Sequence, residues 1–164
     1  MTTIQVSVLR FSVTSSKPFD SIIASLDAVV GHPDMAAFPK AVTAATSYSE
    51  LEQIVRQAIG SSGLMEFARF NLGEILRKDT GADTPRILRL VIGNPLIMKQ
   101  MAVHVPDAAS YAPVTILIDE RPDGVHLSYD RMATYLAPYG NATALKVAQN
   151  LDSKIESLLA NAAA

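Results

Sequence analysis

The sequence predicts one α+β domain over residues 1–164, a two-layer sandwich with a mostly antiparallel sheet and helices on one face. Three observations predict it. Apolar β-branched residues alternate near the N-terminus and again between residues 86 and 130. Apolar residues recur at helical spacing after the first strand and after residue 141, and a Pro-Asp-Gly turn joins two strands directly.

Residues 3–14 are predicted to form a strand whose alternation changes register along its length. Its apolar residues are Ile4, Val6 and Val8 on one face, and Leu9, Phe11 and Val13 on the other. A helix follows, with apolar positions from Ile22 to Val30, and Gly31 ends it. Ser47-Tyr48-Ser49-Glu50 is a capping box that starts an extra inserted helix around 47–60.

The second half of the chain contributes most of the sheet and two more helices. The predicted elements are a strand at 64–71, a helical turn at 72–77, a polar loop at 78–85, a strand at 86–92, a helix at 95–105, a hairpin at 112–130 and a closing helix from 141 or 143. Together they predict a β-α-β4-α core that carries one inserted helix.

Composition excludes several classes of protein. Lys plus Arg is 14 and Asp plus Glu is 16, so the net charge of −2 argues against a nucleic-acid partner. The chain has no cysteine, which excludes disulfides, thiolate metal sites and cysteine nucleophiles. The sequence has neither a secretory signal nor an apolar run long enough for a membrane span, so we expect a cytoplasmic protein without membrane contact.

Several segments in order resemble a known bacterial family. They are Phe67 to Asn71, Leu90-Val91-Ile92-Gly93-Asn94-Pro95, Tyr111-Ala112-Pro113-Val114, the Asp123-Gly124 hairpin, Ser128-Tyr129-Asp130 and Leu151-Asp152. The chain resembles the domain-of-unknown-function 302 family (DUF302), which has the TT1751-like fold. The resemblance implies a strand–helix–four-strand–helix sandwich that forms a homodimer and has no assigned enzymatic activity.

Two local motifs each allow a functional and a structural interpretation. Asn94, between Gly93 and Pro95, either presents helix N–H groups to an anion or simply caps the helix that follows. Met98, Met101 and His104 recur at helical spacing, which suits either a copper or haem ligand set or a core methionine stripe. A cap explains Asn94 completely, and methionine at helical spacing more often fills a core than binds a metal.

Acid–base catalysis is a third functional interpretation of individual residues in the sequence. His104 is the natural proton carrier near neutral pH, with Asp119 or Tyr129 as its partner. If helices cover the sheet face of Asp119, its carboxylate is semi-buried and suited to act as a general base. The simpler interpretation places Asp119 in a solvated hairpin tip with Glu120 and Arg121.

These observations favour a non-catalytic small-molecule-binding or accessory homodimer. The candidate contacts for a small apolar ligand are Phe67, Asn94, Met101, His104, Tyr111 and Tyr129. Two alternatives stay open: an isomerase- or cyclase-type enzyme using His104 with Asp119 or Tyr129, and a metal or haem carrier using Met101 and His104. The sequence assigns no catalytic residue, no metal ligand set and no particular cofactor.

Overall fold

The structure is a computed structural model that describes residues 1, 3, 5–81 and 85–164, and in this part of the chain five antiparallel strands form a sheet. The strands are β1 (Arg10–Ser15), β2 (Met65–Asn71), β3 (Ile87–Gly93), β4 (Val114–Arg121) and β5 (Gly124–Asp130), in the spatial order β1-β5-β4-β3-β2. Only β1 departs from sequence order, because it adds to the free edge of the β4–β5 hairpin.

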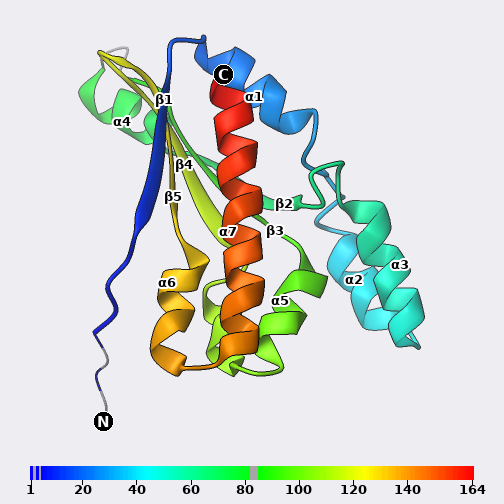
Figure 1. Cartoon of the computed structure of the whole chain (residues 1–164). Coiled ribbons are helices and arrows are strands. Elements are labelled where there is room, and N and C mark those ends of the chain that lie inside the picture. Colours follow the sequence, from blue (N-terminus) through cyan, green and yellow to red (C-terminus); the bar gives the residue numbers. More distant parts are fainter. Residues whose placement is uncertain (2, 4, 82–84) are drawn as a thin grey trace.

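Three helices pack on one face of this sheet: α1 (Phe19–Asp27), α5 (Pro95–Ala102) and the long α7 (Ala142–Ala163), which runs across the front in Figure 1. The remaining helices are α2 (Phe38–Ala44), α3 (Tyr48–Ala58), α4 (Leu72–Thr80) and α6 (Met132–Leu136), with 3-10 turns η1 (Pro106–Ser110) and η2 (Ala137–Tyr139). The α2–α3 pair lies beside the body of the sandwich, away from α7 (Figure 1). The predicted α+β sandwich with an inserted helix is therefore confirmed.

The core lies between the sheet and these helices, where the sequence pattern placed it. Ile116, Ile118 and Leu127 are fully buried on the inner face of the sheet, and Ile155 and Leu159 of α7 are fully buried against them. The apolar residues that alternate along β4 and those at helical spacing along α7 therefore form one apolar layer.

The first strand is shorter than the predicted range of 3–14. β1 begins at Arg10, which pairs with Asp130, the last residue of β5. Residues before Arg10 have no β5 residue left to pair with, so their alternation cannot become sheet. Ile4 lies outside the described residues.

Helix boundaries also differ from the sequence prediction. The helix expected over 95–105 ends at Ala102, and the chain turns at Val103 and His104 before Pro106. The turn expected at 72–77 is the nine-residue helix α4, which takes up Lys78 to Thr80 of the predicted loop and ends at Gly81 in the left-handed region (φ 65°). Part of that predicted loop, residues 82–84, lies outside the described residues.

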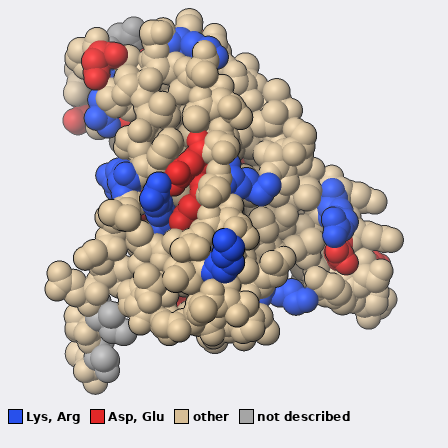
Figure 2. Space-filling model, in the orientation of Figure 1, with Lys and Arg blue, Asp and Glu red and all other residues tan. Residues whose placement is uncertain are grey.

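Figure 2 shows that basic side chains on the α7 face lie beside acidic ones rather than forming a broad patch of one sign. The ion pair between Arg131 and Glu156 of α7 is an example, with Nε and Oε1 2.6 Å apart. Among the described residues, no helix combines the length and apolarity needed to cross a bilayer.

Candidate functional site

A small apolar hollow lies where β3 ends and α5 begins. We call it the apolar hollow; it measures about 100 Å³ and is lined by Phe67, Gly93, Asn94, Pro95, Ile97, Met98, Ala112, Pro113, Val114 and Leu151. Asn94 contributes the only amide, hydroxyl or charged side chain in this lining. The lining therefore favours a hydrocarbon or aromatic group over a charged one.

Local backbone features shape this hollow. The register of β2 against β3 shifts between Glu66 and Ala68, so Phe67 sits at a bulge that changes the direction of its side chain. A Cβ on Gly93 would lie 3.1 Å from the Cβ of Pro113, so glycine lets the proline pack closely against β3. Phe67 and Pro113 thus become neighbours in one wall of the hollow.

Asn94 is held by two hydrogen bonds. Its Oδ1 accepts from the N–H of Leu96 at 2.8 Å, and its Nδ2 donates to the carbonyl of Gly63 at 2.9 Å. The side chain therefore caps α5 and ties it to the turn before β2, as the structural interpretation of Gly-Asn-Pro predicts. Asn94 borders the apolar hollow, but both polar ends of its amide are already engaged.

A second, more polar hollow of about 300 Å³ shares two lining residues with the first. We call it the polar hollow; it is lined by Arg10, Ser110, Tyr111, Pro113, Val114, Thr115, Leu117, Ser128, Tyr129, Asp130, Met132 and Tyr135. The rings of Tyr111 and Tyr135 stack with their centroids 4.7 Å apart, and Arg10 binds Asp130 through two hydrogen bonds of 2.6 and 2.8 Å. Pro113 and Val114 line both hollows.

Tyr129 belongs mainly to a buried network beneath the polar hollow. Its hydroxyl donates to Oδ1 of Asp152 at 2.6 Å, and that carboxylate also accepts the N–H groups of Met132 and Ala133 at 2.7 and 3.1 Å. Burial raises the pKa of Asp152, while the hydrogen bonds from Tyr129 and from the two N–H groups oppose the rise. Burial likewise raises the pKa of Tyr129, with the Asp152 carboxylate adding to the effect. The pair joins β5, the start of α6 and α7, which is a structural role.

The six predicted ligand contacts do not form one site. Phe67 and Asn94 line the apolar hollow, and Tyr111 and Tyr129 line the polar hollow. Met101 is fully buried in the core, and His104 is exposed beyond the end of α5. A metal or haem bound by both Met101 and His104 would have to reach a fully buried thioether. The structure therefore favours the interpretation of Met101 as a core residue.

The structure also separates His104 from Asp119. Asp119 lies five residues along β4 from Val114, roughly 16 Å away at the usual rise of a strand, whereas His104 follows α5 at the other end of the sheet. The expectation that Asp119 lies in a solvated tip is wrong, because its residue is 8% exposed. Arg121 covers it, with Nε 2.5 Å from Oδ2. Neither described hollow contains both residues.

Sequence reasoning missed a cluster of charged groups on the edge strand β2. Asp27, His32 and Glu66 lie together with Arg69, although they come from α1, the segment after it and β2. No local motif joins them, since residues 27 and 66 are far apart in the chain. Backbone pairing of Gly31 with Met65 brings the neighbouring His32 to β2, and no local pattern in the sequence indicates that pairing.

The fold and the hollows define a class: an α+β two-layer sandwich with an apolar hollow at the end of its third strand. Residues 40–162 match the family described as "Domain of unknown function DUF302", so the chain belongs to the DUF302 family. The crystal structure of an uncharacterized conserved protein DUF302 from Bacillus stearothermophilus has a similar fold, with a TM-score of 0.64 and 10% sequence identity over 94% of this chain and 98% of that chain. No curated protein matches this chain.

Proposed function

We propose that the chain is a non-catalytic small-molecule-binding protein whose ligand has an apolar end and a polar end. The supporting observation is that two hollows of different lining, one apolar and one polar, share Pro113 and Val114. A cavity of roughly 150 Å³ accepts a benzene-sized molecule, so the 100 Å³ apolar hollow suits a short aliphatic or small aromatic group. The polar hollow, which is larger and includes Arg10 and Ser128, suits the polar end of the ligand.

An anionic aromatic probe tests this proposal directly. We expect 8-anilinonaphthalene-1-sulfonate to bind the full chain saturably, with its fluorescence reporting the affinity. Met98→Gln places an amide in the apolar hollow and should weaken binding, because a buried amide without a partner is unfavourable. Leu96→Gln is the matched control on the same helix, since Leu96 is half-buried and does not line the hollow.

Equal affinities of both variants and the wild type would refute the apolar hollow as the binding site. Native mass spectrometry of protein purified from its own host then addresses the natural ligand. A discrete extra mass that is lost on denaturation supports the binding role.

The homodimer is the second part of the proposal. Phe70, Ile75 and Leu76, at the end of β2 and in α4, expose 46%, 66% and 44% of their surfaces. Three large apolar side chains within seven residues are typical of a surface that meets another protein. A second copy of the chain would cover them in a symmetric contact.

Sedimentation analysis tests the dimer. We expect the wild-type chain to sediment as a dimer and Ile75→Arg to sediment as a monomer. Val103→Arg is the control, because Val103 is 70% exposed at the far end of α5 and should not affect assembly. A monomeric wild type, or an Ile75→Arg variant that remains dimeric, would overturn this part of the proposal.

A further inference from the structure

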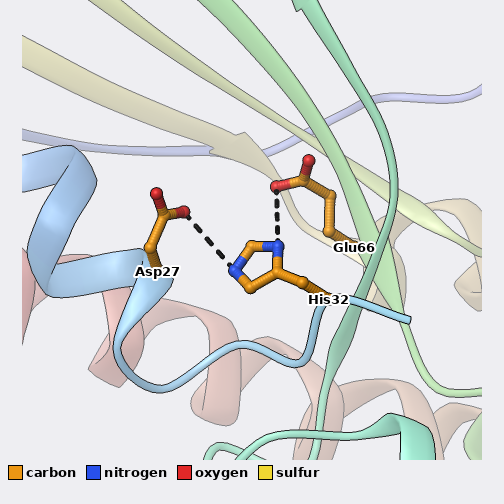
Figure 3. A group of neighbouring side chains, drawn as sticks. All are labelled: Asp27, His32 and Glu66. Carbon is orange, nitrogen blue, oxygen red and sulfur yellow. Dashed lines mark ion pairs between the residues drawn. The ribbon is translucent and has the colours of Figure 1, made fainter. Parts of the chain in front are cut away.

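The edge of the sandwich at β2 carries three potential metal ligands from separate parts of the chain. Asp27 is the last residue of α1, His32 lies in the following segment and Glu66 belongs to β2 (Figure 3). One ligand atom from each residue lies within 4.8 Å of those of the other two. This cluster belongs to neither the apolar nor the polar hollow.

Backbone pairing brings His32 and Glu66 together. Gly31 donates its N–H to the carbonyl of Leu64 at 2.9 Å and accepts from the N–H of Glu66 at 2.8 Å, so His32 emerges beside β2. A Cβ on Gly31 would lie 2.0 Å from the carbonyl oxygen of Ala58, which means that only glycine permits this approach. These contacts hold the backbone of His32 beside that of Glu66.

The imidazole of His32 points between the two carboxylates. Its Nε2 lies 3.6 Å from Oδ1 of Asp27, and its Nδ1 lies 3.9 Å from Oε2 of Glu66 (Figure 3). In the part of the chain that the structure describes, neither ring nitrogen makes a hydrogen bond. Ligands bound to Zn²⁺ at about 2.0–2.2 Å stand roughly 3.4 Å apart in a tetrahedron, so a rotation of the ring brings one nitrogen into range of a shared ion.

Arg69 donates hydrogen bonds to both carboxylates, including to the two oxygens that face His32. Its Nη2 lies 2.5 Å from Oδ1 of Asp27 and 2.6 Å from Oε2 of Glu66, and its Nε donates to Oε1 of Glu66 at 3.0 Å. Each carboxylate oxygen has two lone pairs, so these hydrogen bonds orient both ligands and leave acceptor capacity for an ion. Two carboxylates and one guanidinium together carry a formal charge of −1, which favours a further cation.

We propose that Asp27, His32 and Glu66 form a binding site for a borderline divalent transition metal of the Zn²⁺ class. One imidazole with two carboxylates suits such an ion better than Ca²⁺ or Mg²⁺, which prefer oxygen ligands alone. The side chains of His32 and Asp27 are 41% and 38% exposed and that of Glu66 is 14% exposed, so the site is open to solvent. Three protein ligands leave a coordination position for water or another small molecule.

Calorimetric titration of the untagged, chelator-treated full chain with Zn²⁺ tests the site, and Co²⁺ absorbance reports the coordination. We expect one equivalent to bind. His32→Ala should weaken binding at least tenfold, because it removes the nitrogen ligand. His104→Ala is the matched control, since His104 is exposed and does not belong to the cluster, and it should bind like the wild type.

Asp27→Asn and Glu66→Gln keep the side-chain shapes while removing a charge, and each should also weaken binding at least tenfold. Circular dichroism melts confirm that each variant is folded before titration. The absence of one-to-one Zn²⁺ binding to the wild type would overturn the proposal. Wild-type affinity in folded His32→Ala, or in both carboxylate variants, would overturn it equally.

Discussion

Replacement of Tyr129 by Phe tests the buried network that joins β5, α6 and α7. The substitution keeps the ring in the core and removes a hydroxyl that donates to Asp152 at 2.6 Å. The carboxylate keeps the N–H groups of Met132 and Ala133 at 2.7 and 3.1 Å, so one donor of three is lost. A hydrogen bond to a charged group contributes about 1.5–3 kcal/mol, so we expect a loss of about 2 kcal/mol near neutral pH.

The same variant carries a pH signature whose sign follows from the structure. The Tyr129 hydrogen bond lowers the pKa of Asp152 against the effect of burial, so its removal raises that pKa further. A carboxyl whose pKa is raised by folding stabilises the fold while it is protonated, and this contribution is lost as pH rises through the raised value. The stability difference between wild type and Tyr129→Phe should therefore grow from acidic to neutral pH.

Urea denaturation at several pH values measures this difference. Tyr135→Phe is the control, because the ring of Tyr135 stacks on Tyr111 and its loss of a hydroxyl should change stability by less than about 0.5 kcal/mol. A Tyr129→Phe variant as stable as the wild type, or one whose deficit is largest at acidic pH, would refute the reasoning.

Three further predictions concern other parts of the fold. Gly31→Ala should destabilise the protein by more than about 3 kcal/mol in urea denaturation, because its Cβ would meet the carbonyl oxygen of Ala58 at 2.0 Å. Gly81→Ala, which meets no atom within 4 Å, should cost only about 1 kcal/mol for its positive φ, and equal losses would contradict this reasoning. Asn94→Ala should lower thermal stability by about 1–2 kcal/mol, since it removes the α5 cap and the bond to Gly63, and an unchanged melting temperature would argue against that role. The hydrogen bond from Arg86 lowers the pKa of Glu120, so this pair stabilises the fold above the ordinary carboxyl pKa of 4.5 and loses that contribution as pH falls through the lowered value. Glu120→Gln should therefore show a weaker acid dependence of its melting temperature than the wild type, and parallel acid profiles would disprove it.

Local patterns were sufficient to predict most of the fold. The alternation around Ile116 and Leu127 identified the β4–β5 hairpin, and the helical spacing around Leu151 and Ile155 identified α7. Alternation before Arg10 was misleading because a strand needs a partner, and β5 ends at Asp130. Pairing length is a property of two segments together, which the pattern of one segment does not contain.

The candidate sites were less predictable for the same reason. Phe67 and Asn94 were found because each lies in a recognisable strand or turn that borders the apolar hollow. The spacing of Met101 and His104 indicated one helix face, but α5 ends between them, so one side chain is buried and the other exposed. The Asp27–His32–Glu66 cluster depends on the pairing of Gly31 with Met65, a contact across more than thirty residues that no local motif indicates.

Gly31 and Gly60 lie side by side at the two ends of the segment that contains α2 and α3. The N–H groups of both glycines donate to the same carbonyl, that of Leu64, at 2.9 and 3.0 Å. The chain thus leaves the sandwich and re-enters it at one place, and α2 and α3 form a side branch between these two residues. We expect changes of length or sequence in this branch to leave the strand register unaltered where the contact of Tyr48 in α3 with Lys99 in α5 is kept. The helix pair is therefore the natural position at which this scaffold accepts a new segment, such as a grafted recognition helix, while β2 and the core stay in place.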